Sequence, residues 1–271
     1  MPDRTRTGTG TRRPVERGLG WLRLPLIGAF GFLYLPIAVL VVMSFNASSI
    51  PFVWTGFSLQ WYPTLASNPQ VLQGLLNTLV VAVAATVGAT ILGTLLAVGL
   101  ARYTRSVLLE AYSLAPAIIP DLVLAIGLLI LFTSIGLTLS LFSVVLAHIV
   151  FGMAFVAAVV TARIGQTDPS LEEASRDLGA TGPTTFLRIT VPSLAPAIIA
   201  GALLVFTLSL DEFVIAFFTD GPRTPTLPIV IYSMVRFGVT PEINALGALL
   251  LLVSFTVVLA AQRITRLTDA L

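Results

Sequence analysis

EASRDLGATGPTTFLRITVP, residues 173–192, is a charged and glycine-containing stretch between two long apolar segments of a 271-residue chain. The whole chain is 56% hydrophobic and only 10% charged, whereas soluble domains carry about 25% charged residues. It is therefore an integral membrane protein, and its polar remainder is too short and scattered for a second folded domain. A membrane chain rarely keeps an ordered, charged element between two spans unless something docks there. Residues 173–192 are therefore the first candidate for a docking element.

The residues around Glu173 are typical of a short capped helix. Ser170, followed three positions later by Glu173, predicts a capping box at the start. Gly179 suits the left-handed conformation in which many helices end. Glu172 and Arg176 are spaced for an i, i+4 ion pair. Positions i, i+3, i+4 and i+7 form one small, mostly apolar face, made of Leu171, Ala174, Ser175 and Leu178.

A second short helix is expected to start at Thr181-Gly182-Pro183 and to end before Pro192. Together the two helices would form a compact helix–glycine–helix unit over about residues 168–190. On physical grounds alone, an ordinary amphipathic helix in a loop explains this pattern equally well.

Six stretches are long and apolar enough to cross a bilayer, which takes roughly 20 residues. Pro116 and Pro120 predict a kink in the third stretch, and Gly88 and Gly93 favour close helix approach in the second. We expect a disordered basic tail over 1–23, a six-span domain over 24–264 and a short tail over 265–271. The six predicted spans are 24–45, 75–101, 108–133, 139–162, 192–218 and 243–263.

Arginine predicts the orientation of these spans. Thirteen of the fifteen basic residues fall on one side of the predicted topology, and only Arg223 and Arg236 fall on the other. Because basic loops stay in the cytoplasm, both termini and residues 173–192 are expected there. The chain contains no lysine and no cysteine. It therefore lacks a phosphate-binding P-loop of its own and any thiolate metal site, and no cofactor is expected.

Residues 173–192 resemble the EAA motif of ABC importer permeases, E-A-A-x3-G-x9-I-x-L-P. Glu173, Ala174 and Gly179 match the motif at the right spacing, while Ser175 replaces the second alanine and Val191 replaces the leucine. In that family the element is a coupling helix, which sits in a cleft of the ATP-binding subunit. The resemblance implies an ATPase-coupling role for Glu172, Glu173, Ala174, Ser175, Asp177, Leu178, Gly179 and Ala180.

Nearly all of the chain after the first span is similar to spermidine/putrescine-type permeases, and most similar to their C-type subunit. The similarity is carried by PDLVLAIGLL at 120–129, LSLDEFVIAFFTDGP at 208–222 and LPIVIYSMVRFGVTPEINAL at 227–246. It implies an all-α membrane protein with the six-helix, type I ABC importer permease fold. The implied partners are a pair of ATP-binding subunits, a homologous second permease in a heterodimer, an extracytoplasmic substrate-binding protein and the lipid bilayer. No nucleic acid is expected.

Three carboxylates, those of Asp121, Asp211 and Glu212, lie at membrane depth in this topology. Ionisable groups inside a bilayer cost at least ~2.5–3.5 kcal/mol on insertion scales and therefore indicate function. No arginine shares their depth, and an unbalanced acidic interior suits a cationic cargo. Phe213 and Tyr232 could add cation–π contacts, although scattered aromatic residues more often serve packing.

Other roles remain open for these residues. Asp121 could instead cap the half-helix that Pro120 creates. Asp211 and Glu212 are about 100° apart on a helix, so at most one faces a central path squarely, and Asp211 is favoured. His148, the only histidine, more often makes a hydrogen bond between helices than a site.

The sequence therefore predicts a permease subunit, not an enzyme, of an ATP-driven importer of spermidine and putrescine in the cell membrane. Another small organic cation or an amino acid derivative is the alternative cargo. An ion-coupled secondary transporter would use the three carboxylates as a relay, but it predicts an internal repeat that the sequence lacks. An intramembrane enzyme has few plausible catalytic sets in a chain with one histidine and no cysteine.

Overall fold

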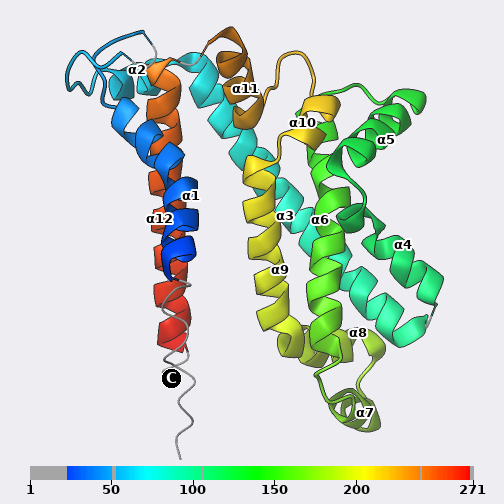
Figure 1. Cartoon of the computed structure of the whole chain (residues 1–271). Helices are drawn as coiled ribbons and strands as arrows, with labels where there is room; N and C mark the ends of the chain where they lie inside the picture. Colours follow the sequence, from blue (N-terminus) through cyan, green and yellow to red (C-terminus); the bar gives the residue numbers. More distant parts are fainter. Residues whose placement is uncertain (1–22, 51–52, 105, 239, 269–271) are drawn as a thin grey trace, which may run out of the picture. The chain divides into compact units, whose positions relative to one another are not determined.

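The computed structural model describes residues 23–50, 53–104, 106–238 and 240–268. All regular secondary structure in these ranges is helical, apart from an isolated bridge between Asn46 and Phe57 (Figure 1). The all-α prediction is therefore confirmed for the described residues. Almost all of the predicted disordered tail lies outside them. The chain divides into two compact units, one of residues 1–63 with 240–271 and one of residues 64–239.

The first unit pairs the first and last helices of the chain. α1 (Arg23–Met43) packs along α12 (Pro241–Thr268), and Gly247 lies against the side chain of Leu40. α12 covers the sixth predicted span, although its side chains are described only as far as Thr256.

Asn46 organises the loop that follows α1. Its buried side-chain oxygen accepts hydrogen bonds from the backbone N–H groups of Ser48 and Thr55, at 3.2 and 3.1 Å. Its backbone oxygen accepts a bond of 2.7 Å from the indole of Trp61, the first residue of α2 (Trp61–Ser67). Asn46 thus holds together the described residues of this loop.

Three long helices form the core of the second unit. α3 (Pro69–Tyr103) and α6 (Leu141–Ile164) run parallel, and α9 (Val191–Asp211) runs antiparallel to both. A Cβ added to Gly93 would lie 2.7 Å from the backbone oxygen of Met153, so only glycine permits this approach of α3 to α6. The predicted close approach at Gly93 is confirmed.

The third predicted span is broken rather than kinked. α4 (Val107–Ile118) and α5 (Asp121–Ser134) meet at an angle of 105°. Ile119 and Pro120 between them are extended. Proline removes a helical hydrogen bond and disfavours the helical conformation of the residue before it, so both effects coincide at this junction.

The fifth predicted span, 192–218, is also interrupted. α9 ends at Asp211, Glu212 is extended, and α10 (Val214–Thr219) starts anew. α11 (Leu227–Phe237) follows after a loop. Four described helices are long and apolar enough to cross a bilayer, and the broken α4–α5 pair makes a fifth candidate.

Two short helices connect α6 to α9. These are α7 (Ser170–Asp177) and α8 (Gly182–Thr185), which continues through a π-helical turn, η2 (Phe186–Thr190), into α9. They lie at the opposite end of α6 and α9 from α10, as Figure 1 shows. The second unit therefore has a polar end at α7 and α8 and a carboxylate-bearing end at α10.

Candidate functional site

Asp168, rather than the predicted capping box, starts α7. Its carboxylate accepts a 2.9 Å hydrogen bond from the backbone N–H of Ser170, and this bond lowers the pKa of Asp168. Ser170 is already the first residue of α7, and the box with Glu173 does not form. The reason is that Pro169 takes a helical φ of −66°, which moves the capping position to the residue before it.

Gly179 ends α7, as predicted. Its φ is +87°, a conformation that favours glycine. Its N–H donates to the oxygen of Arg176 at 2.8 Å, and the N–H of Ala180 donates to the oxygen of Ser175 at 3.1 Å. This pair of bonds is the Schellman motif. The backbone alone therefore fixes the end of α7.

The predicted small face of α7 borders an open groove of about 480 Å³ between α7 and α8. Leu178 is 90% exposed at the end of this face. The side chain of Ser175 reaches across to Thr185 of α8, with 3.1 Å between the two hydroxyl oxygens. The predicted coupling residues Glu173 and Asp177 are exposed to solvent. This surface therefore offers an apolar side chain, Leu178, and two carboxylates to a docking protein.

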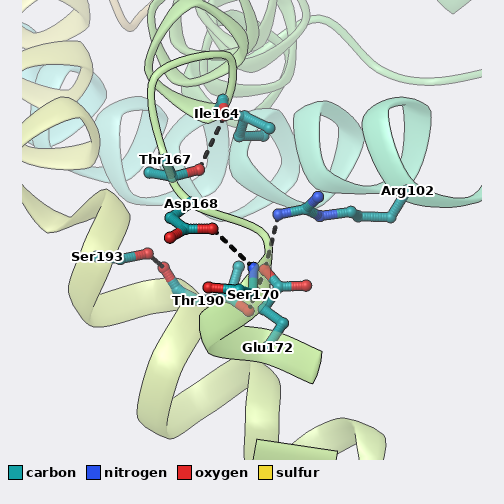
Figure 2. A network of polar contacts seen from close by, with 8 residues as sticks. All are labelled: Arg102, Ile164, Thr167, Asp168, Ser170, Glu172, Thr190 and Ser193. Carbon is teal, nitrogen blue, oxygen red and sulfur yellow. Dashed lines mark hydrogen bonds and ion pairs between the residues drawn. The ribbon is translucent and has the colours of Figure 1, made fainter. Parts of the chain in front are cut away.

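Glu172 differs from its neighbours because it points back to the membrane helices (Figure 2). Its side chain is 14% exposed. Its Oε1 atom lies 2.9 Å from the guanidinium of Arg102, in the last turn of α3. The hydroxyl of Thr190 donates to the same oxygen at 3.0 Å. The predicted pair with Arg176 is therefore wrong, and Glu172 joins three segments of the chain.

Sequence reasoning did not find Arg102 or Thr190. Arg102 is 70 positions from Glu172, and no local spacing links them. Thr190 is in the π-helical turn, in which the N–H of Val191 donates to the oxygen of Phe186. Pro192 follows Val191, and a proline ring clashes with the carbonyl four positions earlier in a regular α-helix. Pro192 could have indicated an irregular turn from the sequence alone. No sequence signal indicates that Thr190 donates to Glu172.

The three predicted membrane carboxylates lie at the breaks between helices. Asp211 is the last residue of α9 and Asp121 the first of α5. Glu212 lies within electrostatic range of both. Its carboxylate accepts the N–H of Ile215 at 3.0 and 3.2 Å and so caps α10. Asp121 makes no capping bond with its side chain at the start of α5.

An aromatic cluster adjoins Glu212. The rings of Phe213 and Tyr232 are 4.9 Å apart, and Phe217 lies 5.4 Å from Phe213 and 5.8 Å from Tyr232. Phe217 was missed in the sequence, although it follows Phe213 by four positions on the same short apolar stretch. Carboxylates next to exposed ring faces are the groups that attract an organic ammonium ion.

His148 makes the expected hydrogen bond between helices. It is buried, and its Nδ1 lies 2.7 Å from the hydroxyl of Ser209 on α9. This bond links α6 to α9 within the core.

Long apolar helices, broken segments and an exposed capped element define a helical membrane permease. The chain belongs to the family of binding-protein-dependent transport system inner membrane components, whose model matches residues 89–269. It is therefore an inner-membrane transport subunit rather than an enzyme, and it stands apart from the ion-coupled transporters.

Curated relatives are similar over most of their length. The putrescine transport system permease protein PotI of Escherichia coli K12 is 41% identical over 247 residues, which cover 88% of each chain. The spermidine/putrescine transport system permease protein PotC of the same strain is 40% identical, covering 88% of this chain and 90% of that one. PotC of Haemophilus influenzae is 38% identical, with 88% and 93% covered.

Solved structures confirm the fold. A bacterial ABC transporter involved in the import of the acidic polysaccharide alginate matches with a TM-score of 0.71 and 16% identity, covering 98% of this chain and 99% of that chain. An amino acid ABC transporter with histidines matches with a TM-score of 0.53 and 20% identity, covering 74% and 96%.

Proposed function

We propose that this permease moves polyamines of the spermidine and putrescine type across the membrane. One observation carries the proposal: Glu212, within electrostatic range of Asp121 and Asp211, directly precedes an aromatic cluster, and the three carboxylates have no basic partner among the described residues. Arg102–Glu172 is the only ion pair among the described residues, so none of the described arginines neutralises the three carboxylates. A passing ammonium group supplies the missing charge. The named cargo of the PotI and PotC relatives agrees with this chemistry.

Of the three carboxylates, Glu212 is the one most expected to contact the cargo. It is half-buried and adjoins Phe213, whereas Asp211 is exposed on the single chain and Asp121 lies at the bend between α4 and α5. A continuous helix over 192–218 favours Asp211 for the path. The break after α9 removes the helical geometry behind that preference, because Glu212 no longer shares a helix with Asp211. The path therefore includes Glu212, Asp211, Asp121, Phe213 and Tyr232.

The exposed face of α7 is the surface on which the ATP-binding subunit docks. Glu173 and Asp177 offer charges, and Leu178 offers an apolar side chain to a cleft. Closure of the paired ATP-binding subunits would then move α7 and switch the permease between its two open states by rigid-body motion. In this proposal α7 and both termini lie in the cytoplasm, as the arginine distribution predicts. A homologous second permease and an extracytoplasmic substrate-binding protein complete the assembly.

Uptake into proteoliposomes tests this function. The permease is reconstituted with its ATPase, second permease and loaded binding protein, and radiolabelled putrescine or spermidine is followed with ATP or with a proton gradient alone. ATP-dependent uptake that excess polyamine inhibits is expected. Uptake driven by the gradient without ATP would disprove the mechanism. Competition by an amino acid derivative but not by polyamines would disprove the cargo.

A further inference from the structure

α3 is an unbroken helix that reaches from the polar end of the second unit to its carboxylate end. It has 35 residues, which correspond to about 52 Å at 1.5 Å per residue. Two of the other segments expected to span the membrane with it are not regular: α4 and α5 are bent against each other, and α9 is preceded by a π-helical turn and ends at Asp211. An unbroken, well-packed helix transmits displacement along its axis better than a broken one.

At the polar end, α3 is attached to α7 through Arg102. The guanidinium contacts Glu172 of α7 at 2.9 Å, and Thr190 holds the same carboxylate oxygen at 3.0 Å (Figure 2). Both hydrogen bonds involve an ionised group, and such bonds are shorter and stronger than neutral ones. A displacement of α7 therefore acts directly on the last turn of α3.

At the other end, α3 is attached to the start of α11 by two buried side chains. The side-chain nitrogen of Asn77 donates to the oxygen of Pro225 at 3.0 Å. The hydroxyl of Thr78 accepts the N–H of Leu227 at 2.7 Å. A Cβ on Gly74 would lie 2.9 Å from Val230, so the two helices are also in close contact. The start of α11 is therefore fixed to α3 by these contacts.

α11 carries Tyr232 into the aromatic cluster. Its ring lies 4.9 Å from that of Phe213, the residue next to Glu212. A contiguous series of contacts thus connects Glu172 to Glu212 without following the direct course of the chain through α8, η2 and α9.

We propose that α3 is the rod that transmits the movement of α7 to the aromatic cluster, and that Arg102 is the positioning residue that attaches the rod to α7. This inference rests on the proposed function, because α7 must be the element that the ATPase moves. It assigns Glu172 to the inner attachment of the permease rather than to the surface that meets the ATPase. Such a two-ended element couples two sites if both bias its position.

The test uses the assembled complex with spin labels in the cysteine-free chain. Phe142→Cys at the start of α6 and Val235→Cys on α11 carry the labels, and the distance between them is measured with and without bound ATP. Transport per ATP hydrolysed is measured in parallel. Arg102→Gln is compared with Arg223→Gln, an exposed arginine with no ion pair among the described residues.

Arg102→Gln should retain the ATPase and its hydrolysis, lose most of the ATP-dependent distance change and transport about fivefold less per ATP, a typical size for coupling between sites. The double variant Arg102→Glu/Glu172→Arg should restore coupling, since the hydroxyl of Thr190 can also accept a hydrogen bond. Arg223→Gln should behave like the wild type. If ATP changes the distance between the two labels in Arg102→Gln as much as in the wild type, the proposal that α3 transmits the movement is wrong.

Thr78→Val tests the other attachment and keeps the proposal testable if Arg102→Gln does not assemble. It removes the acceptor for Leu227 and leaves α7 intact, so it should uncouple transport in the same way. Normal coupling in Thr78→Val would also overturn the rod. If the wild-type complex itself fails to bind the ATPase or to transport with ATP, the proposed function fails instead, and the two failures are thus distinguishable.

Discussion

The guanidinium of Arg102 lies 2.9 Å from the carboxylate of Glu172, and this pair binds the short helix α7 to the far end of α3. An amphipathic helix in an ordinary loop needs no such attachment. Isolated exposed pairs contribute only ~0.2–1 kcal/mol, but Glu172 is largely shielded and shares its oxygen with Thr190. The pair and the threonine therefore act as one unit.

Thr190→Val should lower the stability of the protein by about 1–2 kcal/mol, since hydrogen bonds to charged groups contribute about 1.5–3 kcal/mol when shielded. For a chain of this size the expected fall in Tm is about 2–8 °C. Tryptophan fluorescence during heating measures it. Thr207→Val is the matched control, because exposed Thr207 bonds only to the Leu203 oxygen of its own helix. Equal shifts in both variants would show that the bond to Glu172 contributes nothing special.

Substitutions at Gly179 should weaken binding of the ATPase, and Gly179→Ala should weaken it more than Gly179→Asn. The left-handed conformation costs an alanine roughly 1–2 kcal/mol, equivalent to about 5–30-fold in affinity; asparagine tolerates it better. Because no atom lies within 4 Å of an added Cβ, the effect comes from the backbone and not from a clash. Gly182→Ala is the control, since Gly182 is also in open space but starts a helix. Binding to immobilised ATPase is the measurement, and equal losses at both glycines would contradict the prediction.

Neutralising the carboxylates near α10 should reduce polyamine uptake while the complex still assembles. For Glu212→Gln and Asp211→Asn we expect a rise in the apparent KM of about tenfold, which corresponds to 1.4 kcal/mol of lost attraction. The larger effect should fall on Glu212, which adjoins the aromatic cluster. Glu110→Gln, an exposed carboxylate in the first turn of α4, is the control. Unchanged uptake kinetics would remove the substituted residue from the path.

Acid should loosen the first turn of α7. The hydrogen bonds from Ser170 lower the pKa of Asp168 below its ordinary value of 3.8. A lowered pKa means that the carboxylate stabilises the helix above pH 3.8 and that this contribution disappears as the pH falls through the folded-state value. Hydrogen exchange of the amides at the start of α7 should therefore show less protection in acid. Asp168→Asn retains a capping oxygen that does not titrate in this range, so its protection should not follow the same pH dependence.

Hydropathy and motif spacing predicted much of this molecule. The all-α fold, the position of α7, the end of α7 at Gly179 and the close helix contact at Gly93 all follow from local patterns. Each depends on residues that are neighbours in the chain or on a requirement for glycine. Features of this kind can be predicted from the local sequence.

The breaks and long-range partners were less accessible. Hydropathy predicts a single apolar span over 192–218. In the structure the carboxylate of Glu212 caps α10, and this local hydrogen bond competes with continuation of the α9 helix. Glu172 and Arg176 have the right spacing for a pair, yet tertiary packing presents Arg102 instead. Sequence spacing describes an isolated helix, whereas the choice of partner depends on which distant helix ends nearby.

Because of the Schellman motif at Gly179, the length of α7 does not depend on which side chains its surface carries. Backbone bonds from Gly179 and Ala180 stop the helix, and no side chain takes part in them. Residues on the exposed face can therefore vary without changing how far α7 extends. Ser175 stands where the EAA motif has alanine, and its hydroxyl lies 3.1 Å from that of Thr185. A permease built this way can adapt to a different ATPase by exchanging surface residues while the dimensions of the joint stay constant.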